Sequence, residues 1–256
     1  MNPDEIKRFY EQSGVVLHYA VAVDRVGLWR SEQMLFTRMF SPGHNLLEVG
    51  CGAGRIAIGL YRHGYHNLTA MDCSEEMISV ARTLAEERGV KVPFSVGDAC
   101  ALDYTDSQFD GVIFGFNGLM QIPGLDRREL AIREIARVLK PGGYFVFTTH
   151  DRANPRYRKH WKDEQRAWEL EQQHPLYEDF GDRIGGTPWG DMFIHVPDRA
   201  EIHDALTRSG FFLLACRERG ELANEPPEVR EFSDDCLFWV ARKKVSEAAP
   251  DAEGER

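Results

Sequence analysis

The sequence predicts an α/β protein built on a doubly wound, seven-stranded and mostly parallel sheet. From Asn45 onward, short apolar runs alternate with segments whose apolar residues recur at helical spacing, as in strands joined by crossover helices. A glycine-rich break follows the first run, where sheets of this kind receive ligands. The last two runs are joined by a short, proline-rich connection, so we expect the last strand to be antiparallel.

The first five strands are expected in a regular order along the chain. Their apolar runs are NLLEVG (45–50), NLTAMD (67–72), VPFSVGD (92–98), FDGVIFGF (109–116) and YFVFTTH (144–150). Pro93 restricts the third run to an edge strand, because proline lacks the N–H that a central strand needs. Ser74 is expected to cap the second helix, and the Pro141-Gly142-Gly143 run is expected to stop the third.

Three segments fall outside this alternation. Residues 1–44 have an apolar helical face and are expected to form a helical cap across the edge or top of the sheet. Residues 45–243 form the α/β domain, and residues 151–196 are an insertion after its fifth strand. A helix capped at Asp198 and the strands FFLLACRER and DCLFWVARKK complete the domain. The small, charged residues 244–256 are expected to form a disordered tail.

Composition excludes several classes of protein. The chain has 256 residues, with 41 Asp and Glu against 31 Lys and Arg, a formal net charge of -10. This balance argues against nucleic acid as a partner, because phosphates require a basic face. No apolar run reaches the ~18 residues of a membrane span, and the N-terminus does not resemble a signal peptide. The five scattered cysteines predict reduced thiols in the cytoplasm and no metal site.

The glycine turn is the strongest functional signal. Gly50, Gly52 and Gly54 alternate with single residues between a strand and a helix, where missing side chains let a ligand approach the backbone. The helix N-terminus adds free N–H groups and partial positive charge. A tight strand-to-helix turn is the structural alternative. The dinucleotide fingerprint G-x-G-x-x-G would need glycine at position 55, which is Arg55.

The Glu48-x-Gly50-x-Gly52-x-Gly54 pattern resembles motif I of the class I S-adenosylmethionine-dependent methyltransferases. The segments FDGVIFGFNGL and IARVLKPGGYFVFTT are similar to the family's fourth- and fifth-strand motifs, so the resemblance covers about residues 45–150. It implies a Rossmann-like methyltransferase fold, methyl transfer and S-adenosylmethionine as cofactor. Asp72 matches the family's ribose-binding acid and Asp98 its adenine-binding acid. The alternative role of either aspartate is to cap a turn or helix.

The resemblance implies the following cofactor-binding residues: Glu48, Gly50, Cys51, Gly52, Gly54, Asp72, Cys73, Met77, Asp98, Ala99, Phe114 and Asn117. The methyl group is expected to point toward the loop after the fourth strand. Members that methylate nucleic-acid bases often carry an Asp/Asn-Pro-Pro-aromatic motif there. This chain has Phe116-Asn117-Gly118-Leu119, which favours another acceptor.

We therefore expect a small-molecule methyl acceptor, bound under a lid formed where residues 1–44 and 151–196 meet. The catalytic candidates are Asn117, His150 and His195, and the substrate-binding candidates are Tyr10, Tyr19, Arg30, His150, Trp161, Arg183 and His195. Packing or surface exposure is the alternative for each. The alternative functions are an RNA or protein methyltransferase, and, from another class, a nicotinamide-dependent oxidoreductase or a non-catalytic nucleotide-binding module. The sequence predicts no particular oligomeric state.

Overall fold

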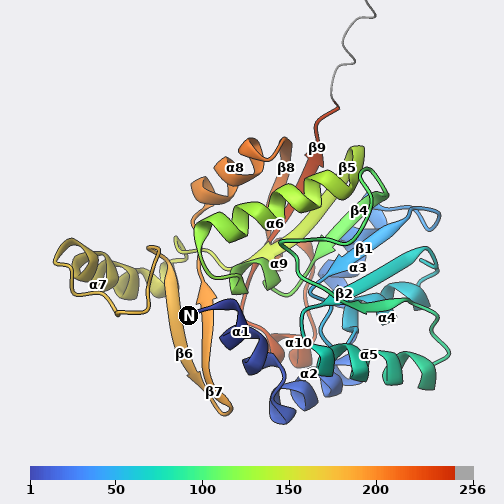
Figure 1. Ribbon diagram of the computed structural model, residues 1–256, viewed down its shortest axis with the longest axis horizontal. Helices are drawn as coiled ribbons and strands as arrows, with labels where there is room; N and C mark the ends of the chain where they lie inside the picture. The colour runs from blue at the N-terminus through green and yellow to red at the C-terminus, as the bar shows by residue number, and fades with distance from the viewer. Residues whose placement is uncertain (246–256) are drawn as a thin grey trace, which may run out of the picture.

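The computed structural model describes residues 1–245, which form a seven-stranded sheet and a separate two-stranded hairpin (Figure 1). The predicted fold class is confirmed: β9 is antiparallel to both of its neighbours, whereas the first five strands are parallel. In spatial order the strands are β3 (Phe94–Val96), β2 (Leu68–Asp72), β1 (Leu46–Val49), β4 (Phe109–Phe114), β5 (Leu139–Thr149), β9 (Leu237–Lys243) and β8 (Phe211–Glu218). The order reverses between β1 and β4, which is where sheets of this type bind ligands.

Helices cover both faces of the sheet. They are α1 (Pro3–Tyr10), α2 (Ser13–Arg25), α3 (Arg30–Met39), α4 (Arg55–Arg62), α5 (Glu75–Glu87), α6 (Leu125–Val138), α7 (Arg158–Glu169), α8 (Arg199–Arg208), α9 (Arg219–Leu222) and α10 (Pro227–Phe232), with 3-10 turns η1 (Gly118–Gln121) and η2 (Pro155–Tyr157). Alternate residues of each central strand pack into two different cores. The core on one face joins the sheet to α1–α5, and the other joins it to α6 and α8.

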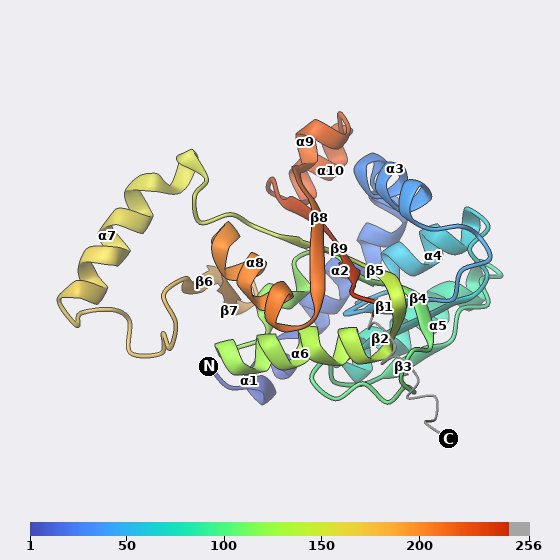
Figure 2. The ribbon, with the colours of Figure 1, turned by 90° about the horizontal axis from the view of Figure 1, so that it is seen from above.

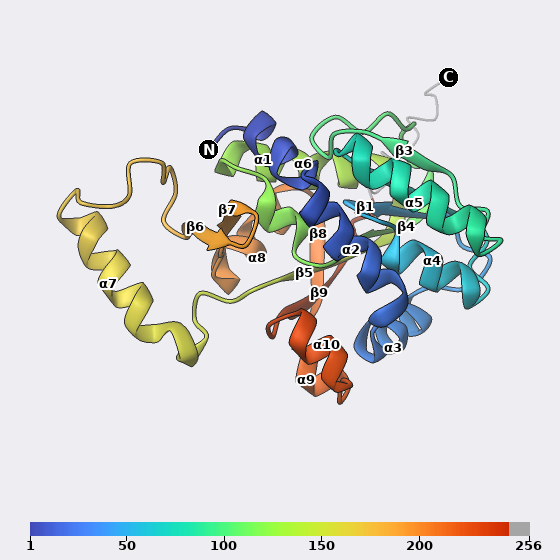
Figure 3. The ribbon, with the colours of Figure 1, turned by 90° about the horizontal axis from the view of Figure 1, so that it is seen from below.

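The N-terminal helices lie against the ligand-binding half of the sheet. Helix α2 packs on α4 and α5, and the view from below shows α1 and α2 beside α5 (Figure 3). Expected caps are present: Ser74 accepts from the N–H of Met77, and Asp198 accepts from the N–H of Glu201. No helix within residues 1–245 is both long and apolar enough to cross a membrane.

Strand β5 begins earlier than the sequence predicts. Leu139 pairs with Phe109, and the register then shifts so that Tyr144 pairs with Gly111. The residues between them include Gly142 at φ +79 and belong to an irregular stretch of strand. The Pro-Gly-Gly run therefore ends α6, as expected, but it lies within β5 instead of before it.

The insertion at residues 151–196 contains α7 and the hairpin of β6 (Asp182–Thr187) and β7 (Gly190–His195). Helix α7 projects to one side of the molecule, away from the sheet, in views from the front and from above (Figures 1 and 2). The expected tail at 244–256 lies outside the described residues except for its first two positions. The division into cap, domain and insertion stays a prediction.

Candidate functional site

A cavity of about 140 Å³ lies beside the ends of β1, β2 and β4. Its lining includes every predicted cofactor-binding residue except Gly54 and Asn117. Helices α1 and α2 contribute Tyr10 and Tyr19, and α10 contributes Phe232. The carboxyl ends of neighbouring parallel strands thus bring the glycine turn and both predicted acids to one place.

Two glycines of the turn explain why side chains are missing there. Gly50 has φ +66, and a Cβ on it would lie 2.6 Å from the Phe114 ring. Gly52 has φ +52, and a Cβ there would lie 3.5 Å from the Tyr19 ring, in space that belongs to the cavity. The turn therefore needs the left-handed backbone and leaves an open cradle against β1.

Asp72 ends β2 and holds the glycine turn. One carboxylate oxygen accepts from the N–H of Gly52 at 2.8 Å, and the other accepts from the N–H of Ser74 at 2.9 Å. A carboxylate has about four acceptor positions, so both oxygens keep capacity for a ligand. Burial raises the pKa of Asp72, although these backbone donors act against that rise. Asp98 lies at the far side of the cavity, where its side chain is more exposed and pairs with Arg127 at 3.2 Å.

Glu48 supplies an unpaired acid to the cavity. It is 2% exposed, its Oε2 has no hydrogen-bond partner within residues 1–245, and burial raises its pKa to about 8. Arg55, which follows the glycine turn, makes a bidentate pair with Glu32 of α3 at 2.6 Å to each oxygen. Its guanidinium also lies 4.7 Å from the centre of the Trp29 ring. Arg55 therefore joins the turn to the N-terminal helices.

Two tyrosines from the N-terminal helices complete this end of the cavity. Tyr10 is 8% exposed, and its hydroxyl is unpartnered in the described part of the chain. Its ring meets that of Tyr19 edge-on, with centroids 6.1 Å apart. Burial raises the pKa of Tyr19 to about 12 and that of Tyr10 well above its ordinary value, so both phenols are neutral hydrogen-bond donors at neutral pH.

The loop after β4 has a strained backbone. Phe116 and Asn117 have φ +47 and +61, which side-chain-bearing residues rarely adopt. The N–H of Asn117 donates to Thr148 Oγ1 at 2.8 Å, and its amide nitrogen lies 3.4 Å from His150 Nε2. Asn117 and His150 are thus neighbours at the ends of β4 and β5, but only Phe116 of these three lines the cavity.

Besides His150 and His195, three other substrate-binding candidates do not line this cavity. Arg30 begins α3, and its guanidinium donates to the carbonyl of Asn224. Trp161 of α7 packs in a small core with Met120 and Val196, and the Arg183 guanidinium lies 5.9 Å from its ring centre. Trp161 and Arg183 thus pack within the insertion, in line with the structural alternative that the sequence left open.

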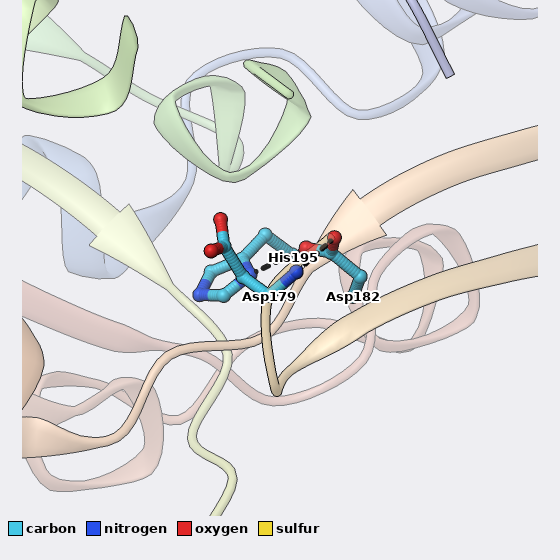
Figure 4. A group of neighbouring side chains, drawn as sticks. All are labelled: Asp179, Asp182 and His195. Carbon is cyan, nitrogen blue, oxygen red and sulfur yellow. Dashed lines mark hydrogen bonds and ion pairs between the residues drawn. The ribbon is translucent and has the colours of Figure 1, made fainter. Parts of the chain in front are cut away.

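His195 belongs to an ionic network, which we call the hairpin cluster: Asp179, Asp182, His195 and Glu201, with Arg128 and Arg152. Figure 4 shows three of its members, Asp179, Asp182 and His195. His195 Nδ1 lies 2.7 Å from Asp182, and Nε2 lies 2.8 Å from Glu201. Asp179, Asp182 and His195 present ligand atoms within 4.8 Å of one another, as metal ligands do. However, Arg128 pairs with Asp179 at 2.9 Å, and His195 is 1% exposed and does not line the cofactor cavity.

The sequence reasoning missed several residues that complete the cavity. Phe232 comes from a short helix between the last two strands, where no local motif marks it. Gln121 and Ile122 follow the strained loop, and Ile6 comes from α1. Ile6 occupies the apolar face of an N-terminal helix, a signal that was available but predicts packing equally well.

Comparison with known proteins identifies a matching domain family and relatives of this chain. The sequence profile described as "Methyltransferase domain" matches residues 46–143. The methyltransferase GfsG of Streptomyces halstedii is 32% identical over 158 residues, covering 54% of this chain and 55% of the relative. A demethylmenaquinone methyltransferase of Leptospira interrogans is 34% identical over 144 residues, covering 54% and 53%. The chain thus spans about half the length of these relatives.

Among solved structures, a protein of Methanosarcina mazei described as an S-adenosylmethionine-dependent methyltransferase has a TM-score of 0.67 and 24% identity. The superposition covers 82% of this chain and 97% of that one, so the shared fold extends beyond the part that matches the two relatives in sequence.

Proposed function

We propose that this chain, whose residues 46–143 match a methyltransferase domain, is a class I S-adenosylmethionine-dependent methyltransferase that transfers a methyl group to a small-molecule acceptor. When bound, S-adenosylmethionine supplies an electrophilic methyl carbon on a cationic sulfur. The observation that carries the proposal is a cradle of positive-φ glycines surrounded by Glu48, Asp72 and the unpartnered Tyr10 hydroxyl. The two relatives named above are also described as methyltransferases, one of them acting on demethylmenaquinone.

The chain's own groups fit this cofactor. Asp72 has acceptor capacity for the two ribose hydroxyls, since two backbone donors already fix its carboxylate and leave acceptor positions free. Asp98 would accept from the adenine amino group. The open space above Gly52 would take the methionine part, and the Tyr10 hydroxyl would donate to its carboxylate or to the acceptor. A cation in the cavity would favour the ionised form of the buried Glu48 and lower its pKa.

We further propose an in-line displacement in a site closed by the N-terminal helices. A bond forms between the acceptor atom and the methyl carbon as the bond from that carbon to sulfur breaks, and the acceptor releases its proton. The chain's contribution is alignment and exclusion of water. In support, Tyr10, Tyr19 and Ile6 cover the glycine turn from one side, and Phe116 and Phe232 border the same space. Motion of these helices as a lid, and a cytoplasmic location, stay predictions.

Substitution of Gly52 tests this proposal. Gly52→Ala should weaken binding of S-adenosylhomocysteine by about tenfold or more, because its Cβ takes ligand space beside Tyr19. Gly89→Ala is the matched control: Gly89 has φ +65, and a Cβ there meets nothing within 4 Å. Both variants should lose about 1–2 kcal/mol of unfolding free energy to left-handed strain. Calorimetric titration of both variants with S-adenosylhomocysteine distinguishes the effect of backbone strain from the loss of space for the ligand.

Equal affinity in Gly52→Ala and the parent would refute the placement of the cofactor. Stabilisation by NAD instead of S-adenosylhomocysteine in a thermal-shift assay would favour the oxidoreductase alternative. Labelled S-adenosylmethionine incubated with separate metabolite, RNA and protein fractions distinguishes a small-molecule acceptor from the macromolecular alternatives.

A further inference from the structure

A groove of about 490 Å³ lies next to the cofactor cavity, on the far side of Phe232. We call it the α2–α10 groove, after the two helices that form most of it. Its wall consists mainly of Leu17, His18, Val21, Trp189 and Phe232, with Arg25 and Glu231 at the rim. Its volume is in the range of small-molecule sites.

Three segments that are distant in the sequence form the aromatic wall. The Trp189 indole, from the turn of the β6–β7 hairpin, lies directly on Gly14 of α2, where a Cβ would collide with it. The His18 ring lies between two others: its centroid is 5.1 Å from that of Trp189 and 5.0 Å from that of Phe232, on which it stacks at 18°. The N-terminal helices and the insertion therefore meet here, beside the cofactor cavity.

The groove adjoins the cofactor cavity. Phe232 and Ala22 line both spaces. On the cavity side, the Phe232 ring stacks on Phe116 at 5.1 Å and 24°. Phe116 belongs to the strained loop toward which the methyl group is expected to point. A single aromatic ring thus separates the groove from the expected place of methyl transfer.

The chemistry of the wall selects an apolar, uncharged occupant. Leu17 and Val21 are 64% and 50% exposed, an arrangement that a bound apolar molecule would stabilise by removing their surface from water. Among the charged residues of the groove, Arg25 pairs with Glu231 at 3.2 Å. Glu228 is exposed and has no ion pair among residues 1–245, so the groove disfavours an anion. Burial lowers the pKa of His18, which keeps its ring neutral among the other aromatic rings. Flat rings stack on such a wall.

We propose that the α2–α10 groove is the acceptor-binding site: it holds the ring system of an uncharged aromatic molecule, whose reacting atom extends past the edge of Phe232 to the cofactor. This inference rests on the proposed function, and it assigns to the hairpin the role of presenting Trp189.

Binding of 2-naphthol tests the assignment independently of activity. Calorimetry is performed on the protein with and without saturating S-adenosylhomocysteine. Leu17→Asp places a carboxylate on the groove wall and should weaken 2-naphthol binding about tenfold or more, because the probe would desolvate the charge. Leu214→Asp is the matched control, since Leu214 is 52% exposed on β8, outside the groove. Trp189→Ala should also weaken 2-naphthol, and decahydro-2-naphthol, which cannot stack, should bind the parent more weakly than 2-naphthol does.

S-adenosylhomocysteine affinity should be the same in the parent, Leu17→Asp and Leu214→Asp. If S-adenosylhomocysteine binds but 2-naphthol does not, or if Leu17→Asp binds 2-naphthol as tightly as Leu214→Asp, the groove assignment is overturned and the proposed function stands. If the parent fails to bind S-adenosylhomocysteine, the proposed function is overturned, and the groove loses its role as an acceptor site.

Discussion

Two buried acidic regions of this molecule differ in how completely their polar atoms are paired. In the hairpin cluster, both nitrogens of His195 contact carboxylates, and Asp182 also accepts the N–H groups of Glu178 and Asp179. In the cofactor cavity, Glu48 Oε2 and the Tyr10 hydroxyl have no partner among residues 1–245. An unpaired buried polar group costs folding free energy, so the unpaired atoms of Glu48 and Tyr10 favour a ligand. The paired carboxylates and imidazole of the hairpin cluster favour a structural role.

The pKa values show the same contrast. Burial raises the pKa of Glu48 to about 8, and nothing nearby compensates fully. Burial acts in the same direction on Asp182, but the hydrogen bonds from His195 and the two backbone N–H groups lower its pKa overall. Asp182 and His195 resemble a catalytic pair, but their hydrogen bonds favour a structural role. Glu48, whose Oε2 lacks such a partner among residues 1–245, marks the expected binding site.

The largest expected effect comes from breaking the hairpin cluster. Asp182→Ala should lower the free energy of unfolding by about 3–5 kcal/mol, because the buried His195 Nδ1 and the backbone N–H groups of Glu178 and Asp179 lose their acceptor. Asp191→Ala is the control, since Asp191 is exposed in the same hairpin and should change stability by less than about 0.5 kcal/mol. Urea unfolding measures both. Loss of S-adenosylhomocysteine binding by a folded Asp182→Ala variant would contradict a purely structural role.

The second effect is the pH dependence that Glu48 imposes. Its folded-state pKa of about 8 lies above the usual 4.5, so the folded chain holds a proton that the unfolded chain releases between these values. The free energy of unfolding of the parent should therefore fall as pH rises through this window, relative to Glu48→Gln. The difference should grow by a few kcal/mol, on the order of 1.4 per pKa unit, between pH 5 and pH 9.

Urea titrations of parent and Glu48→Gln across this range measure the difference, and groups common to both proteins cancel. A difference that does not vary with pH would mean that Glu48 is already ionised in the folded state, and the contrast between the two regions would disappear.

The smallest of the three effects separates the two aspartates of the cavity. Asp72→Asn should weaken S-adenosylhomocysteine binding by about 1.5–3 kcal/mol, because the ligand loses a charged acceptor. The variant should also lose some stability, since an amide NH₂ faces the N–H of either Gly52 or Ser74. Asp98→Asn should cost about 1 kcal/mol or less, because the Asp98 side chain is 55% exposed. A larger loss for Asp98→Asn by calorimetry would reverse their assigned roles.

Local sequence patterns predicted the strands and the glycine turn because each rests on neighbouring residues. Gly50 and Gly52 adopt positive φ within a turn whose flanking strand and helix are visible in the sequence. Asp72 ends its strand, so its position follows from the parallel order of the sheet.

The other walls of the cavity and the groove depend on contacts between residues that are distant in the sequence, and local sequence patterns do not predict such contacts. Arg30 was expected to bind a ligand carboxylate, but Glu225 accepts its backbone N–H and that of Ser31, holding α3 beside α9. His195 was a catalytic candidate, yet the hairpin register pairs it with Asp182. Phe232 lines both cavities from a segment without any motif.

The long-range ties of the N-terminal helices have a consequence for how the protein is made. The Arg25–Glu231 pair joins residues 206 positions apart, and the bond from Ser31 to Glu225 spans 194 positions. During translation, α2 and α3 leave the ribosome long before the residues that complete their surroundings. The His18 and Tyr19 rings, which pack on Phe232, lack that partner throughout the interval, and such unpacked apolar surface favours aggregation and chaperone binding. The sheet's first five strands can pair while synthesis continues, but the wall that Phe232 supplies to the cavity forms only after residue 232 has been synthesised.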